Sequence, residues 1–147
     1  MIARILILSL SLWLSGCTIA GKSPPSRFYI LPGPEAARPM SRIKLVIAIA
    51  PVRLPKYLHR PQIVTVRRDG VIELAEFHRW AEPLTAGFTR VLRAGLANRL
   101  PQSHVVILPA PRSRPDWLIE TRVHEFQVHP KHCILQADWR LIRGTRI

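Results

Sequence analysis

Residues 83–100 (PLTAGFTRVLRAGLANRL) are the most informative stretch of the sequence, because their apolar positions recur with the period of an α-helix. The stripe consists of Leu84, Phe88, Val91, Leu92 and Leu96. Pro83 suits the first turn of a helix, and Pro101 marks its end. The pattern predicts one amphipathic helix. Gly95 lies within the stripe, so we expect the helix to approach a sheet closely there.

Strand patterns occur on both sides of this helix. Residues 43–50 (IKLVIAIA) form a nearly continuous apolar run that stops at Pro51, which is typical of a central strand buried on both faces. Asp69-Gly70 separates two β-branched runs and predicts a hairpin. The other expected strands are residues 27–31, 62–66, 71–77, 104–108, 117–128 and 133–141, the last two forming a second hairpin around Pro130.

The predicted fold class is α/β in two layers, with a mixed or antiparallel sheet and one clear amphipathic helix packed on it. Residues 133–141 alternate strictly, with Cys133, Leu135, Ala137, Trp139 and Leu141 on one face, so we expect a half-buried strand. One helix covers only part of a sheet with this many strands. We therefore expect exposed apolar surface, as if a C-terminal closing helix were missing.

Length and composition narrow the class of protein. A chain of 147 residues supports one domain, and its 48% hydrophobic content is ordinary for a globular protein. No apolar run reaches the roughly 20 residues of a spanning helix, and two cysteines do not make a disulfide scaffold. The formal net charge of +13 indicates an anionic partner surface, which could be nucleic acid, phospholipid or an acidic protein.

The N-terminus predicts export and lipidation. Arg4 is followed by an apolar run over residues 5–14, and Leu14-Ser15-Gly16-Cys17 resembles the bacterial lipobox. We expect residues 1–16 to be a signal peptide and residues 17–26 to be a lipidated Cys17 with a proline-rich tether. The lipobox resemblance and Thr18, the sorting position, imply an outer-membrane lipoprotein. The alternative is an ordinary secreted protein with a chance cysteine near its cleavage site.

Candidate catalytic chemistry is sparse, and we predict no catalytic residue, no metal site and no cofactor. No phosphate-binding glycine motif and no nucleophile elbow occurs. The best metal candidates are His129, His132 and Cys133, with His124 and Asp138 nearby. Their spacing is unlike that of paired zinc ligands, so we interpret them as a solvated turn beside a small buried residue.

Two segments, which we call blocks, are richer in proline, arginine and aromatic residues than a loop usually is. Residues 51–64 (PVRLPKYLHRPQIV) contain three prolines that would present Arg53, Tyr57 and Arg60 with little ordering cost. Residues 73–84 (ELAEFHRWAEPL) place Arg79 and Trp80 at a strand–helix corner. All five are candidates for contact with a partner or with lipid. The structural alternative is that Trp80 and Phe77 fill the core, and that the arginines are solvated or paired with Glu76 and Glu82.

Both blocks resemble the ABC-type transport auxiliary lipoprotein family, through PVRLPxYLxRPQIV and LAEFxRWAEPL followed by an amphipathic helix. The SGC lipobox, the PSRFYIL segment and the late AxWRL strand are also similar to that family. The resemblance implies a non-enzymatic, lipid-anchored subunit that faces the periplasm from the outer membrane. Its implied partner is a PqiB-like subunit of a mammalian-cell-entry (MCE)-type phospholipid transporter.

The resemblance also implies contact with outer-membrane lipid and a ring-like homo-oligomer, without nucleic acid. Residues 27–147 would form the family domain. Members usually continue with another strand and a C-terminal helix, so we expect this domain to be C-terminally incomplete.

Two other function classes remain open from the residues alone. The charge permits a nucleic-acid-binding domain, although export and the 7% aromatic content argue against base stacking. A secreted metal enzyme would have to use His124, His129, His132 or Cys133.

Overall fold

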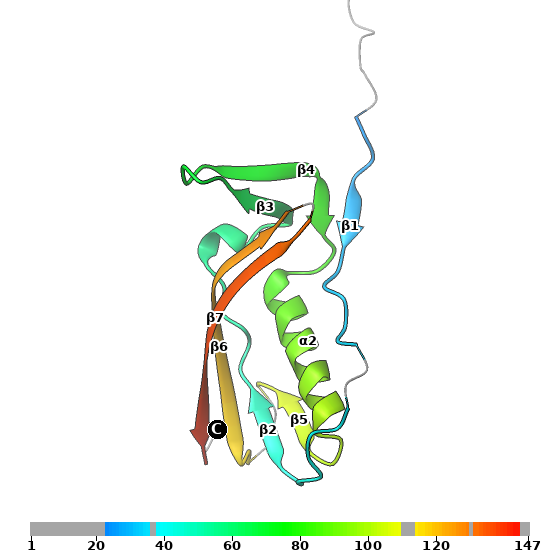
Figure 1. Ribbon diagram of the computed structural model, residues 1–147, viewed down its shortest axis with the longest axis vertical. Helices are drawn as coiled ribbons and strands as arrows, with labels where there is room; N and C mark the ends of the chain where they lie inside the picture. The colour runs from blue at the N-terminus through cyan, green and yellow to red at the C-terminus, as the bar shows by residue number, and fades with distance from the viewer. Residues whose placement is uncertain (1–22, 36–37, 110–113, 130, 145–147) are drawn as a thin grey trace, which may run out of the picture.

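A computed structural model describes residues 23–35, 38–109, 114–129 and 131–144. Within them the chain forms two small sheets and one α-helix, α2 (Figure 1). The elements are β1 (Arg27–Tyr29), β2 (Val46–Ile49), the 3-10 helix η1 (Lys56–Leu58), β3 (Gln62–Val66), β4 (Ile72–Trp80), α2 (Leu84–Arg99), β5 (His104–Ile107), β6 (Trp117–Val128) and β7 (Cys133–Arg143).

Both sheets are mixed. The first has the order β1-β4-β3, in which β1 runs parallel to β4 and β3 runs antiparallel to it. The second has the order β5-β2-β6-β7, in which β2 is parallel to both of its neighbours and β6 and β7 form an antiparallel hairpin. The predicted class, an α/β fold with one helix and mixed strands, is confirmed. The strands divide between two sheets, which the patterns alone did not indicate.

The helix begins and ends where its prolines predict. Pro83 is the N-cap and Leu100 the C-cap of α2, one residue before Pro101. The hairpin prediction at Asp69-Gly70 is also confirmed, because Gly70 has the positive φ of 82° that the turn requires. The expectation for Gly95 is wrong. The nearest atoms to a Cβ placed there belong to Arg99 and Pro34, so this glycine faces a loop instead of a sheet.

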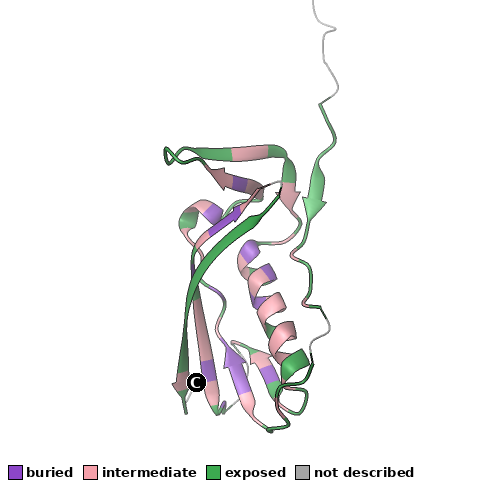
Figure 2. Ribbon diagram, in the orientation of Figure 1, coloured by how far each residue is buried: buried purple, intermediate pink, exposed green. Residues whose placement is uncertain are grey.

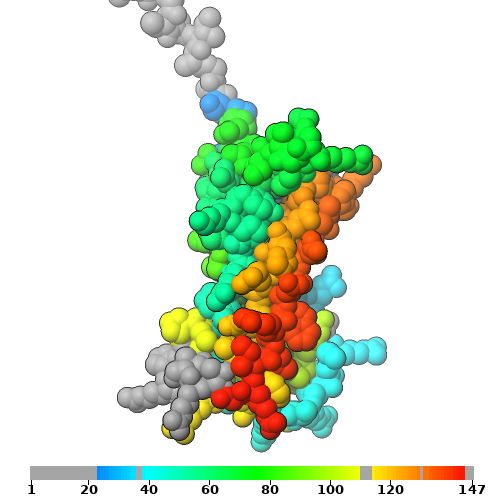
Figure 3. Space-filling view, turned by 90° about the vertical axis from the view of Figure 1, so that its left-hand side faces the viewer, coloured from blue at the N-terminus to red at the C-terminus, as the bar shows by residue number. Residues whose placement is uncertain are grey.

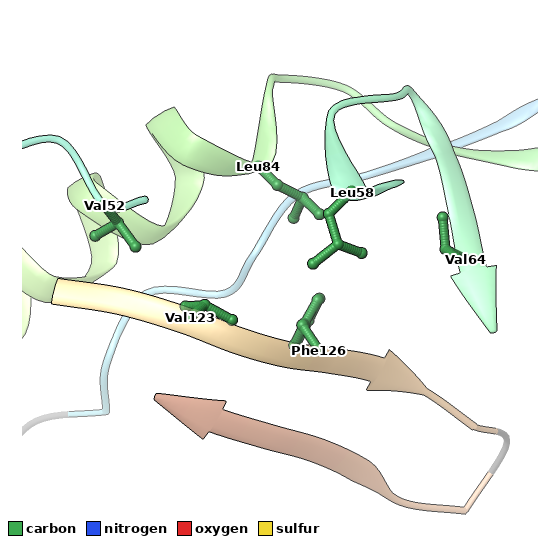
Figure 4. Close-up of a cluster of buried hydrophobic side chains, with 6 residues drawn as sticks. All are labelled: Val52, Leu58, Val64, Leu84, Val123 and Phe126. Carbon is green, nitrogen blue, oxygen red and sulfur yellow. The ribbon is translucent and has the colours of Figure 1, made fainter. Parts of the chain in front are cut away.

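A hydrophobic core joins the helix to both sheets. Its buried members are Val52, Leu58, Val64, Leu84, Val123 and Phe126. Figure 4 shows Val123 and Phe126 on β6, with the Phe126 side chain directed toward Leu58. The central strand β2 is the other buried element, with Ala48 and Ile49 fully inaccessible, as the run at residues 43–50 predicts. The corner between β4 and α2 is therefore held by packed side chains from several elements.

One buried hydroxyl ties α2 to the chain that leaves β2. The Thr89 side chain donates to the Thr85 carbonyl at 2.6 Å and accepts from the Val52 N–H at 3.0 Å, and Thr89 is 4% exposed. Thr89→Val keeps the shape but leaves that buried N–H unpaired, so we expect a loss of about 1–3 kcal/mol in unfolding free energy. Urea unfolding followed by circular dichroism measures it. Thr89→Ser, which keeps both bonds, should lose less; equal losses would contradict this account.

The prediction that the strand at residues 133–141 is half-buried is wrong. Every residue of β7 is exposed except Ile142, which is half-buried, and Trp139 is 70% exposed (Figure 2). Ala137 pairs with Val123 and Leu135 with Phe126, so both lie on the face that carries the core. That core ends at β6, however. Among the described residues nothing packs over β7, and Figure 3 shows β6 and β7 along the molecular surface.

The expectation of exposed apolar surface is therefore confirmed on β7. Within the described ranges, α2 is the only α-helix, and no helix among them is long and apolar enough to cross a membrane.

Candidate functional site

A hollow lies at the corner where β4 turns into α2. Its volume is about 510 Å³, and it is lined by Leu58, His59, Arg60, Pro61, Trp80, Ala81, Glu82, Pro83, Leu84 and Thr85. Apart from Thr85, these residues come from the two unusual sequence blocks, one on each side. The structure therefore brings together Arg60 and Trp80, which lie twenty residues apart in the sequence.

Short backbone contacts hold the two sides of this corner hollow together. The Trp80 N–H donates to the Pro61 carbonyl at 2.6 Å, and the Ala81 N–H donates to the Tyr29 carbonyl at 2.8 Å. A shift in the β3–β4 register between Gln62 and Ile63 lets β4 bend at this point. Because Pro61 and Pro83 fix the backbone on either side, the walls are set by the chain itself.

The apolar floor of the hollow continues into the core. The Trp80 ring lies 6.0 Å from the Phe126 ring between centroids, and Phe126 makes an edge contact with Phe88 at 5.0 Å. Such aromatic contacts stabilise a fixed ring orientation. Trp80 therefore packs on the core, as the structural alternative expected, and also lines the hollow. Its contact with a partner or with lipid stays a prediction.

The polar rim has an uneven charge distribution. Arg60 and His59 are exposed on one side, and Glu82 stands on the other. Glu82 is already paired, because Arg90 donates to its carboxylate at 2.5 and 3.2 Å. Neither a side-chain cap nor an acidic residue occupies the first turn of α2. This arrangement suits a ligand or partner segment with an apolar part and a negative or carbonyl group near Arg60.

The other three candidate residues lie elsewhere. Arg53 borders a second hollow of about 240 Å³ on β6 and β7, with Glu120, Thr121, Arg122, Asp138, Trp139 and Arg140. Tyr57 is half-buried and packs against the core. Arg79 lies on β4, and its Nε donates to the Glu76 carbonyl at 3.4 Å. Phe77 is exposed, so the alternative that it fills the core is wrong.

The histidine and cysteine candidates do not converge. Among the described residues no three His, Cys, Asp or Glu side chains are placed to hold a metal ion. His129 and His132 stack on each other at 4.5 Å, and His124 Nε2 lies 2.6 Å from an Asp138 carboxylate oxygen. Cys133 is exposed, contrary to the expectation that it begins a buried face. Cys17 and Thr18 lie outside the described residues.

The sequence analysis missed the ion pair between Arg90 and Glu82, the one carboxylate that lines the hollow. Arg90 also donates to the Leu31 carbonyl at 3.0 Å. Glu82 stands two residues before the first residue of α2, and Arg90 follows it by two helical turns. No local spacing rule marks such a pair, because the chain between them changes from loop to helix.

The two sheets, the single helix and the open corner hollow define a small α/β domain without a recognisable cofactor cradle in the part of the chain that is described. The family model for the ABC-type transport auxiliary lipoprotein component matches residues 29–146. The chain belongs to this family, as the two motifs indicated. A comparison with curated proteins finds no match.

Solved structures support the same fold. An uncharacterized protein, known from its crystal structure, is 20% identical with a TM-score of 0.56, over 84% of each chain. Protein XCC0632 from Xanthomonas campestris, a DUF330 protein, is 13% identical with a TM-score of 0.52, over 80% of this chain and 77% of its own. At these identities the likeness concerns the fold alone.

Proposed function

We propose that this protein is an outer-membrane lipoprotein, anchored through Cys17, that serves as a non-enzymatic accessory subunit of an MCE-type phospholipid transport system. The observation that carries the proposal is the family match at residues 29–146, directly downstream of a lipobox-like Leu14-Ser15-Gly16-Cys17. A lipid anchor and a transport-component domain in one chain indicate a tethered subunit that supports membrane integrity.

The corner hollow is where we expect the transporter partner to bind. It offers apolar surface from Trp80, Pro61 and Pro83 beside the exposed Arg60. Its one carboxylate, Glu82, is held by Arg90. A PqiB-like subunit would insert an apolar side chain flanked by an acidic or carbonyl group. Aromatic and arginine side chains commonly dominate the energy of such contacts.

The excess of positive charge supports a location beside anionic membranes. A lysine or arginine near an anionic leaflet contributes about 1 kcal/mol of attraction. Ring-like self-assembly of the protein stays a prediction of the family resemblance.

The proposal is tested by complementation and by capture of the partner. A strain that lacks this gene should regain its permeability barrier when the natural chain is supplied. An MCE-type subunit should then be recovered with the tagged protein.

Arg60→Ala should weaken recovery of the MCE-type subunit roughly tenfold, because a hot-spot arginine contributes about 1–2 kcal/mol to binding. Arg42→Ala is the matched control, since Arg42 is also exposed but precedes β2, outside the corner hollow. Quantitative pull-down measures both variants. Unchanged recovery with Arg60→Ala would show that the partner binds elsewhere, and a natural chain that fails to complement would reject the transport role.

A further inference from the structure

A second surface lies at the end of the molecule from which the N-terminal segment leads into β1; we call this the entry end. The described residues that precede β1 lie at the end formed by β1, β3 and β4 (Figure 1). The other end is formed by the start of β2 and the last turn of α2. Met40 belongs to that other end, because its N–H donates to the Arg99 carbonyl at 2.8 Å.

The entry end exposes large apolar side chains on one face of β1 and β4. Phe28 is 65% exposed and Ile30 61% exposed, and they lie on the same side of the chain because they are two residues apart. Phe28 pairs in parallel register with Arg79, so the two side chains share a face. Phe77, two residues before Arg79 on β4, is also exposed. We name Phe28, Ile30, Phe77 and Arg79 the entry face.

The opposite side of β1 is occupied by a contact within the protein. Tyr29 stacks on His78 at 5.6 Å between ring centroids, and its hydroxyl lies 2.7 Å from His78 Nδ1. This contact orients β1, so that Phe28 and Ile30 are turned outward. Their exposure thus follows from the way β1 is held on β4.

We infer that the entry face docks on the lipid bilayer to which the chain is anchored. The inference rests on the proposed anchor at Cys17, which precedes Arg27 by ten residues. A chain of that length spans at most about 35 Å, so the entry face stays close to the membrane surface. Because the tether keeps the entry face at a high effective concentration beside the bilayer, a weak surface contact is enough for docking.

The side chains of the entry face are of the kinds that interact favourably with a bilayer surface. Phe28, Ile30 and Phe77 supply apolar and aromatic surface of the kind that settles at the headgroup boundary. Arg79 supplies a positive charge among them for lipid phosphate groups. Its Nε is directed to the Glu76 carbonyl, and no ion-pair partner of Arg79 occurs among the described residues.

Vesicle binding by the mature chain without its anchor tests the entry face alone. The chain from residue 17 onward carrying Cys17→Ser is mixed with vesicles of phosphatidylethanolamine and phosphatidylglycerol and sedimented. We expect binding that falls about tenfold or more in Phe28→Ser/Ile30→Ser. The control Met40→Ser/Ile43→Ser removes two apolar side chains of similar exposure from the other end and should bind like the parent. Absence of parent binding, or equal losses in both variants, would overturn the inference.

A second measurement uses the anchored protein. Ile30→Cys or Ile43→Cys, each with Cys133→Ser, is labelled with an environment-sensitive dye after reconstitution. We expect a blue shift at position 30 and none at position 43. Light scattering adds a further check, because a dimer that depends on Phe28 would assign the entry face to a second copy instead.

The proposed anchor and the proposed docking surface can be rejected independently of each other. Mass spectrometry that finds Cys17 unmodified rejects the proposed anchor while leaving the vesicle result standing. An acylated Cys17 with no vesicle binding and no dye shift rejects the docking alone.

Discussion

Exported without Cys17, the protein is expected to move from the membrane fraction to the soluble periplasmic fraction. Each buried methylene of an acyl chain contributes about 0.8 kcal/mol to membrane attachment. One acyl chain binds only marginally, so stable anchoring needs at least two chains or a second membrane signal. The weak surface contact of the domain cannot replace that energy. For this test the Cys17→Ala chain is exported with a leader that general signal peptidase removes. Cell fractionation then measures how much of the protein leaves the membrane fraction.

The second cysteine provides the control for this experiment. Cys133→Ala removes an exposed thiol at the start of β7 and should leave the protein in the membrane fraction. The Cys17→Ala chain should also fail to restore the permeability barrier. A Cys17→Ala protein that still sediments with membranes when Phe28→Ser/Ile30→Ser has also removed the entry face would refute lipid anchoring at this position.

Phe126→Ala should lower the unfolding free energy by about 3–5 kcal/mol, the cost of deleting a buried aromatic ring. Phe126 is 6% exposed and contacts the rings of both Trp80 and Phe88, so the cavity would open beneath the corner hollow. Small domains have a total stability of about 5–15 kcal/mol, so the loss is a large part of the whole. Urea unfolding at equilibrium measures it.

Phe28→Ala is the matched variant, because the same ring is removed from an exposed position on β1. It should change the unfolding free energy by about 0.5 kcal/mol or less, as surface substitutions usually do. Similar losses in the two variants would mean that Phe126 is not part of a cooperative core.

Local signals in the sequence predicted the elements well. The stripe of α2 with its flanking prolines, and Asp69-Gly70 with its β-branched neighbours, depend on residues close together in the chain. The exposure of β7 could not be predicted in the same way. Alternation shows that one face of a strand is apolar, but burial requires another element to cover that face, and the core ends at β6.

The corner hollow was predictable only in part. Sequence drew attention to Arg60 and Trp80 in separate blocks, but their meeting depends on the bond from Trp80 to Pro61 and on the shifted register of β3. Arg53 and Tyr57 belong to the same block as Arg60 but lie elsewhere, because the chain turns through η1. Arg53 borders the second hollow, and Tyr57 packs against the core. Tertiary geometry, which no spacing rule encodes, separated these neighbours.

The parallel pairing of β1 with β4 has a mechanical consequence for an anchored protein. Tension on the N-terminal side pulls β1 along its own axis, so the load is shared among its hydrogen bonds to β4 and is not applied to one bond at a time. The Ala81–Tyr29 bond at the base of β1 carries part of the same load. Membrane movement would therefore be transmitted through β4 to the start of α2, with little lengthening of the connection.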